Sequence, residues 1–277
     1  SDMWNDDAVY DRILVTTEID PKPPESLGIN PNIDSNETRD LVIGSFSKDA
    51  IFYAYDRSDG EFLYARPTAY QNIIAGYDGS TGAYQIEPKA IMTADIEHEA
   101  TICRENRQIP QGAYSPLTNA YYVPAFNGPC SVMKLNSLEP SLETGYNTSY
   151  IATVPTPAGH LGQPEAINVE TGESLWKLER ETPLYGMLTT GGGLLFAADT
   201  NRRFHALDQW TGEILWNTIL NGASDMAPIS FGVDGKQYIA VFAPSGTQAA
   251  AQHAGQLGLS ATTGVSNVGH TLFVFSL

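Results

Sequence analysis

Short runs of alternating apolar and polar residues, separated by turn-forming residues, extend along most of the chain. The runs are rich in β-branched and aromatic side chains, and Gly, Pro, Asn or Asp stands at their ends. The clearest are residues 11–17, 41–46, 120–124, 194–198, 237–243 and 272–275. Long amphipathic helical patterns are nearly absent, so the pattern predicts an all-β fold.

One motif recurs along the chain. Residues 166–176 (AINVETGESLW) return 40 residues later as 206–216 (ALDQWTGEILW), and residues 54–63 (AYDRSDGEFL) are a weaker copy. Each copy predicts a hairpin in which a strand ends at Asp or Asn, that side chain caps the turn, and Gly takes a positive φ. Trp176 and Trp216 then fall on the second strand, where we expect them to serve blade packing. A period of about 40 residues is typical of a four-stranded β-propeller blade.

Two stretches carry little strand signal. Residues 21–39 are rich in Pro, Asn and Ser and are expected to be an excursion between strands, and residues 249–269 are expected to be a loop of small residues. Neither stretch predicts a domain boundary.

The charge of the chain narrows its possible partners. Fifteen Lys and Arg against 32 Asp and Glu give a net charge of -17, which would repel nucleic acid and anionic membrane surfaces. The acidic surface could serve solubility, or it could steer a cationic partner such as a basic cytochrome. No stretch reaches the roughly 18 apolar residues of a membrane span, and the missing signal-peptide pattern leaves the compartment open.

The cysteine and histidine positions predict no zinc site. Cys103 and Cys130 are the two cysteines, and their spacing alone leaves a disulfide and two unpaired thiols both open. The histidines show no metal-ligand spacing, so each is expected on the surface or in a loop: His98, His160, His205, His253 and His270.

Four segments give a more specific indication. Residues 2–9 (DMWNDDAV), 47–60 (SKDAIFYAYDRSDG), 112–130 and 189–208 occur in an order that resembles the PQQ-dependent (pyrroloquinoline quinone) alcohol dehydrogenases. The first segment is similar to that family's Asp-x-Trp-Asp-x-Asp signature, and the second to its basic residue followed by a strand and Asp-Arg-x-x-Gly. The likeness is greatest to the branch that acts on sorbose, polyvinyl alcohol and related polyols.

The resemblance implies an architecture. The family folds as a β-propeller of about eight blades, and residues 1–277 would be the C-terminal part, roughly the last half, of that single domain. The N-terminal blades would be missing or would lie on another chain, so a fragment, a processed piece and a separate subunit all remain open. Alone, the chain would leave unpaired blade edges exposed.

The resemblance also implies an activity. It is the PQQ-dependent oxidation of a small alcohol or polyol to the aldehyde or ketone, assisted by Ca²⁺ or a lanthanide ion as Lewis acid, with electrons passed to a cytochrome c. The implied compartment is the bacterial periplasm. The alternative is a non-catalytic propeller that serves as an interaction scaffold and has lost cofactor binding.

Lys48 occupies the place of the family's Arg or Lys that reaches the quinone oxygens of PQQ, where a cation stabilises developing negative charge. The alternative is a solvated lysine at the end of a strand.

The N-terminal segment departs from the family pattern. Asn5 stands where the family has its catalytic Asp, and an amide cannot act as a general base, although the polyol branch also carries Asn there. Asp7 matches the metal-coordinating Asp of the lanthanide-using branch, so Asn5 and Asp7 are the candidate metal ligands and a lanthanide is favoured. Asp2, Asp6 and Asp7 are candidates for acid–base catalysis, or else solvated carboxylates of a chain end.

Three further residues match PQQ-contacting positions of the family. Gln108 replaces an Asn or Asp, Tyr185 replaces a Trp, and Asn127 is a candidate that could equally be a turn residue. Cys103 and Cys130 match paired cysteines of the family, so the resemblance implies a structural disulfide between them.

Overall fold

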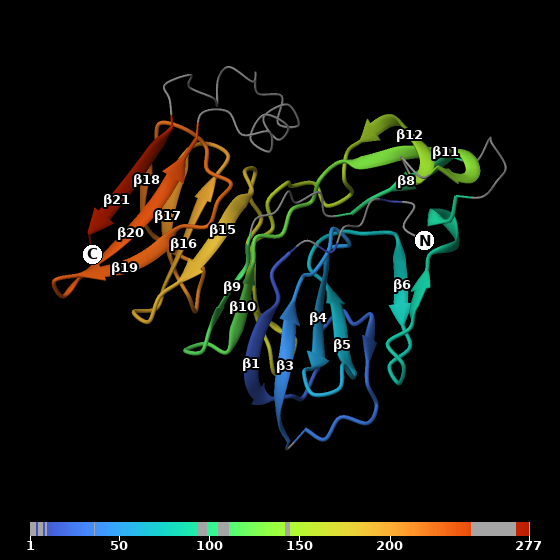
Figure 1. The fold of residues 1–277 in the computed structure, drawn as a ribbon, viewed down its shortest axis with the longest axis horizontal. Helices are drawn as coiled ribbons and strands as arrows, with labels where there is room; N and C mark the ends of the chain where they lie inside the picture. Colours follow the sequence, from blue (N-terminus) through green and yellow to red (C-terminus); the bar gives the residue numbers. More distant parts are fainter. Residues whose placement is uncertain are drawn as a thin grey trace. The chain divides into compact units, whose positions relative to one another are not determined.

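The computed structural model describes residues 4, 8, 10–35, 37–92, 99–104, 111–141, 145–244 and 270–276. The chain divides into two compact units, Ser1–Arg107 with Asn127–His160 and Gln108–Phe126 with Leu161–Leu277. Both consist of antiparallel sheets (Figure 1), which confirms the predicted all-β class. No helix in the described part of the chain is long and apolar enough to cross a membrane.

The first unit contains a five-stranded sheet in the order β1-β3-β4-β5-β2. Its strands are β1 (Ile13–Glu18), β2 (Gly28–Ile29), β3 (Thr38–Gly44), β4 (Ile51–Asp56) and β5 (Phe62–Pro67). The predicted excursion at 21–39 is thus interrupted by β2, in which Gly28 pairs with Ala65 of β5. This added edge strand extends a four-stranded meander, the arrangement expected of a blade.

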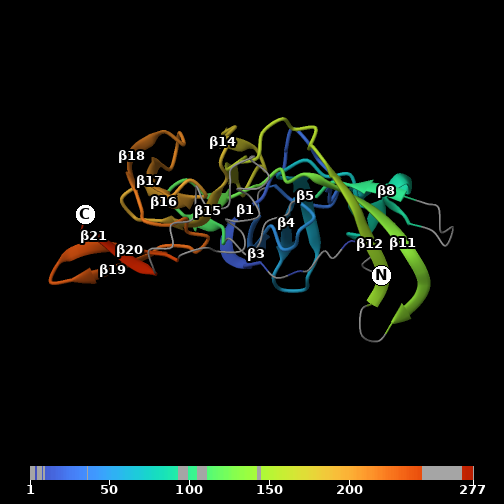
Figure 2. The same cartoon turned by 90° about the horizontal axis from the view of Figure 1, so that it is seen from above.

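The first unit also contains a hairpin and a smaller sheet. The hairpin joins β6 (Ile74–Tyr77) to β7 (Tyr84–Ile86), and the sheet has the order β12-β11-β8. Its strands are β8 (Glu99–Ile102), β11 (Cys130–Ser141) and β12 (Gly145–Val154), and β11 and β12 form a long curved hairpin (Figure 2). Trp4 packs among apolar residues of this region, and its indole N–H donates to the carbonyl oxygen of Ala90 at 3.0 Å.

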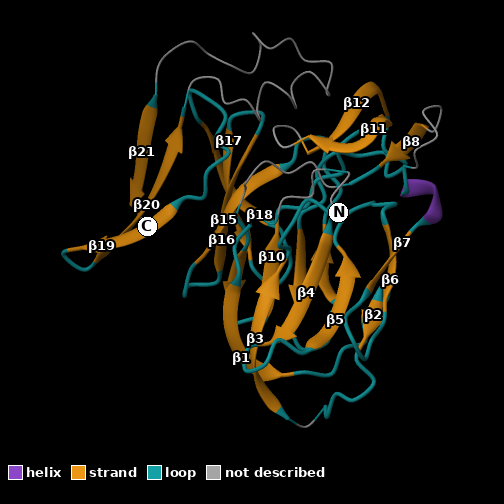
Figure 3. Ribbon diagram, turned by 45° about the vertical axis from the view of Figure 1, so that its right-hand side comes forward, coloured by secondary structure: helices purple, strands orange, loops and turns teal. Residues whose placement is uncertain are grey.

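The second unit contains three sheets. Two are four-stranded, β9-β10-β13-β14 and β15-β16-β17-β18, and the last, β19-β20-β21, has three strands among the described residues (Figure 3). The strands are β9 (Ala113–Ser115), β10 (Ala120–Val123), β13 (Glu165–Asn168), β14 (Ser174–Lys177), β15 (Leu184–Thr189), β16 (Leu194–Asp199), β17 (Arg203–Asp208), β18 (Ile214–Ile219), β19 (Ile229–Val233), β20 (Lys236–Ala243) and β21 (Thr271–Ser276). All six runs identified as strands in the sequence overlap strands of the structure, whereas residues 249–269 lie outside the described residues. One short helical turn, η1 (Pro88–Ala90), completes the elements of the described chain.

The repeated motif forms one type of turn four times. The side-chain oxygen of Asp56, Asp78, Asn168 or Asp208 accepts a backbone N–H two or three residues further on, at 2.8–2.9 Å. The glycine four residues after each donates its N–H back to the carbonyl oxygen of that residue and has a φ between 70° and 82°. The predicted hairpins are therefore confirmed, and the copy at Asp78, between β6 and β7, is one that the repeat analysis missed.

Aromatic residues connect one sheet of the second unit to the next. Trp176 is buried, and its indole N–H donates to the carbonyl oxygen of Gln209, in the turn of the following sheet, at 2.9 Å. Its ring lies against Gly212, where a Cβ atom would be 2.8 Å from the ring. Trp216 packs edge-on against Phe275 of the last sheet with 5.4 Å between ring centroids. The blade-packing role predicted for both tryptophans is confirmed.

The contact between Trp176 and Gly212 can be tested by adding one methyl group. Gly212→Ala is expected to lower the free energy of unfolding by about 1–3 kcal/mol more than Gly235→Ala, because both positions have a positive φ but only Gly212 is crowded. Urea denaturation of the two variants measures the difference. Equal losses would show that the ring does not constrain the turn.

The capping carboxylate of Asp78 makes stability depend on pH. Hydrogen bonds from Ser80 and Thr81 hold its pKa below the usual value, so its stabilising effect is present above about pH 4 and is lost as the pH falls through the lowered pKa. Asn168 caps its own turn without a charge, so Asp78→Asn is expected to retain stability at pH 7 and to lose less than the wild type at pH 3. Urea denaturation at both pH values measures this, and an identical loss in the two proteins would contradict it.

Candidate cofactor site

Lys48 lies in the tight loop between β3 and β4. The residue is 8% exposed, so it is not a solvated lysine. Ala50, two residues later, has a φ of 61°, and its carbonyl oxygen accepts the backbone N–H of Thr68 at 2.7 Å. The end of the loop is therefore fixed against the start of the segment that follows β5.

Asp49 anchors this loop through its carboxylate. One oxygen accepts the backbone N–H of Ile51 at 3.1 Å, and the other accepts the hydroxyl of Tyr53. The hydroxyl of Tyr77 lies 2.7 Å from that of Tyr53. Burial, together with the negative charge of Asp49, raises the pKa of both tyrosines well above the usual value, so both hydroxyls stay protonated.

Aromatic rings surround this hydrogen-bonded group. Phe46 stacks on Tyr53 at 5.5 Å and on Tyr55 at 6.1 Å between ring centroids, and the guanidinium of Arg12 lies 5.3 Å from the centre of the Phe46 ring. We refer to Phe46, Tyr53, Tyr55, Phe62 and Tyr77 as the aromatic cluster. It gives the Lys48 loop a rigid base.

Buried charges in the described part of the first unit are mostly positive. Lys48, Arg66 and Arg104 are 8%, 4% and 9% exposed. Among the described residues of the first unit, Asp49 is the one carboxylate that is buried to the same degree. Arg66 donates to the carbonyl oxygen of Pro67 at 3.2 Å, and Arg104 donates to the hydroxyl of Tyr150 at 3.5 Å.

The other candidate residues are divided between the two units. Asn127, in the first unit, is buried, and its side-chain oxygen accepts the backbone N–H of Tyr70 at 2.9 Å. Tyr185 is buried on β15 of the second unit. Asp2, Asn5, Asp6, Asp7 and Gln108 lie outside the described residues.

A disulfide joins Cys103 and Cys130, as the resemblance implied. The two cysteines are 27 residues apart, so the bridge closes a loop that contains both Gln108 and Asn127. Asn72 adds to this connection, because its side-chain oxygen accepts the backbone N–H of Cys103 at 2.7 Å.

Asn5 and Asp7, the metal ligands implied for the start of the chain, lie outside the described residues, whereas the neighbouring Trp4 is described. Trp4, directly before Asn5, is held in the core of the first unit by its bond to Ala90. Across the described ranges, no group of three or more His, Cys, Asp or Glu residues is placed to bind a metal ion.

His205 corrects one expectation from the sequence. It is buried on β17, not at the surface, and its Nε2 atom lies 3.0 Å from the carboxylate of Asp199, which also lies 3.5 Å from the guanidinium of Arg180. Burial lowers the pKa of Arg180, and the charge of Asp199 opposes that shift. The histidine was missed because both faces of β17 are buried, which the sequence pattern around His205 did not indicate.

Comparison with known proteins finds similarity to PQQ-dependent and quinone-dependent alcohol dehydrogenases. Residues 150–239 match the model of the PQQ family described as "Glucose/ethanol/alcohol dehydrogenase, beta-propeller domain". The dehydrogenase subunit of the quinone alcohol dehydrogenase of Acetobacter aceti is 29% identical over 222 residues, which are 74% of this chain and 29% of that protein. The 1-butanol dehydrogenase (cytochrome c) of Thauera butanivorans is 25% identical over 87% of this chain and 34% of its own length. The lanthanide-dependent methanol dehydrogenase of Methylacidiphilum fumariolicum is 26% identical over 88% of this chain and 38% of its own length.

Solved structures agree on the fold. A europium-containing methanol dehydrogenase superposes with a TM-score of 0.79 at 22% identity. The match covers all of this chain and 49% of the methanol dehydrogenase chain. The quinohemoprotein alcohol dehydrogenase of Comamonas testosteroni gives a TM-score of 0.74 at 20% identity. The predicted β-propeller class is therefore confirmed, and the chain spans about half or less of the relatives it matches.

Proposed function

We propose that the chain, which is similar to PQQ-dependent alcohol dehydrogenases, forms the C-terminal part of an enzyme that oxidises an alcohol to the aldehyde or ketone. The observation that supports this proposal is the burial of Lys48 in a fixed loop; the resemblance implies that this lysine contacts the quinone. A polyol as substrate follows from the branch resemblance and remains a prediction.

Lys48 has a defined part in the proposed reaction. PQQ, when bound, supplies the quinone that accepts the electrons of the alcohol. The Lys48 ammonium would donate hydrogen bonds to the quinone oxygens and would stabilise the negative charge that develops there, an effect that is strong where water is excluded. Gln108, Asn127 and Tyr185 are proposed to hold the cofactor by hydrogen bonds and ring contact.

The start of the chain is proposed to bring oxygen ligands to the reaction. Asn5 and Asp7 would bind Ca²⁺ or a lanthanide, both hard cations that prefer oxygen ligands. Because Asn5 cannot accept a proton, the general base is assigned to Asp2, Asp6 or Asp7. The anchored indole of Trp4 would fix where this segment leaves the core.

The electron acceptor and the compartment follow the same reasoning. A relative is named for cytochrome c, and the acidic surface of this chain suits a basic cytochrome as electron acceptor. The Cys103–Cys130 disulfide supports an oxidising compartment, which for a bacterial protein is the periplasm.

A non-catalytic scaffold is the second candidate. It is favoured by three departures from the family pattern at cofactor positions, namely Asn5, Gln108 and Tyr185. A protein that had lost PQQ would be free to change them, although the buried Lys48 argues for retention.

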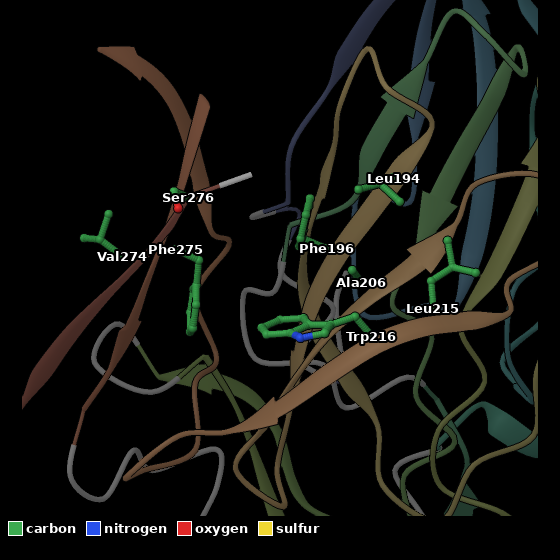
Figure 4. Close-up of a pocket in the computed structure, with 8 residues that line it drawn as sticks. All are labelled: Leu194, Phe196, Ala206, Leu215, Trp216, Val274, Phe275 and Ser276. Atoms are coloured by element: carbon green, nitrogen blue, oxygen red, sulfur yellow. The ribbon is translucent and has the colours of Figure 1, made fainter. Parts of the chain in front are cut away.

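The last sheet offers a surface for the N-terminal half of the propeller. One face is apolar and exposed, formed by Ile229, Phe231, Val233, Leu272 and Val274, which are 39–61% exposed. Two sheets of this unit have four strands, whereas the last sheet has three among the described residues, and a fourth strand in the position equivalent to β18 would pair with β21. A cavity of about 500 Å³ lies beside this edge, between β18 and β21, where Phe275 faces Trp216 (Figure 4). We assign the face and this edge to blades encoded upstream or on a partner chain.

The cofactor proposal is tested by PQQ titration of this chain produced together with the upstream half. Lys48→Ala is expected to weaken PQQ binding by more than about tenfold, since a hydrogen bond to a charged group contributes about 1.5–3 kcal/mol, and to abolish alcohol-dependent dye reduction. Lys48→Arg, which keeps the charge, should retain binding. A folded assembly that binds no PQQ with either Ca²⁺ or La³⁺ present would overturn the proposal and leave the scaffold.

The docking face is tested by adding a charge to it. With the two halves made as separate chains, Phe231→Asp is expected to weaken their association by at least about tenfold, because a buried unpaired charge costs several kcal/mol. The matched control is Leu117→Asp, which adds the same charge at a residue 49% exposed in the turn between β9 and β10. Unchanged affinity of the Phe231 variant in a titration would remove this face from the interface.

A further inference from the structure

A chain of hydrogen bonds begins directly beside Lys48, and the proposed reaction does not itself require it. It runs from the carboxylate of Asp49 to the hydroxyl of Tyr53 and on to the hydroxyl of Tyr77. Because the proton of Tyr53 is donated to the carboxylate, the oxygen of Tyr53 must accept the proton of Tyr77. Such chains strengthen each of their bonds by polarisation, and both tyrosines are fixed within the aromatic cluster.

These bonds restrain the backbone on both sides of Lys48. Before it, the hydroxyl of Ser47 accepts the N–H of Asp49 at 3.4 Å, and after it the carboxylate of Asp49 accepts the N–H of Ile51. Ala50 has a left-handed φ, which is unfavourable for a residue other than glycine. A strained backbone persists only where its surroundings determine it, so the loop needs its side-chain bonds to keep this form.

We propose that Asp49 is the positioning residue for Lys48, and that the hydroxyls of Tyr53 and Tyr77 hold Asp49 in place, so that the ammonium stands at its cofactor-binding position before the cofactor arrives. The inference rests on the proposed role of Lys48. It extends that role to three residues to which the sequence analysis assigned no function.

The test removes one hydroxyl in the protein that contains both halves of the propeller. Tyr53→Phe is expected to weaken PQQ binding about tenfold, measured by fluorescence titration, because the carboxylate of Asp49 loses the hydrogen bond from the Tyr53 hydroxyl. Tyr55→Phe is the matched control: Tyr55 is on the same strand and in the same aromatic cluster, but its hydroxyl is outside the hydrogen-bonded chain. It should change the affinity less than twofold, and thermal unfolding should show both variants folded.

A double-mutant cycle separates positioning from general loss of stability. If Tyr53 acts through Lys48, Tyr53→Phe should have no further effect on PQQ affinity in the Lys48→Ala background. Independent effects that multiply, or equal effects of Tyr53→Phe and Tyr55→Phe, would overturn the inference while leaving the cofactor proposal intact. Failure of the unaltered protein to bind PQQ would instead overturn the cofactor proposal itself.

Discussion

The side-chain-capped glycine turn is the constraint on which the arrangement of these sheets depends. An Asp or Asn at the end of a strand accepts the backbone N–H groups of the turn, and the glycine that follows reverses the chain. At Gly212 the missing side chain has a second use, since it leaves the space that the ring of Trp176 fills. Local turn geometry and the packing of neighbouring sheets are therefore set by the same residue type, and neither can change without the other.

This coupling explains which parts of the fold could be predicted from the sequence. The copies around Asn168 and Asp208 include both the turn residues and the tryptophan, so their period could be recognised. The turn at Asp78 has the same hydrogen bonds, yet its flanking strands are short and lack a tryptophan, and it was not found. The long hairpin of β11 and β12 was also not foreseen, because register shifts interrupt its alternation.

The candidate site was predictable to a smaller extent. Lys48 and the two cysteines were identified through motifs, and the structure buries the first and joins the other two. Asp49 and Tyr53 are only four residues apart, but the network of Asp49, Tyr53 and Tyr77 has no sequence signature, because Tyr77 comes from a different sheet and meets Tyr53 through tertiary packing. The burial of arginines such as Arg66 could not be predicted from the sequence either, since burial of a charge depends on the whole fold.

The burial of Lys48 has a kinetic consequence. Taking an ammonium group out of water is unfavourable, and in this protein that step is completed when the loop folds, before any ligand is present. An anionic ligand therefore meets a cation that has already lost much of its contact with water, and the departure of the ligand leaves that cation in the same poorly solvated place. Affinity at such a site is expressed mainly as slow dissociation, so a ligand bound there would behave as a resident group and not as a freely exchanging one.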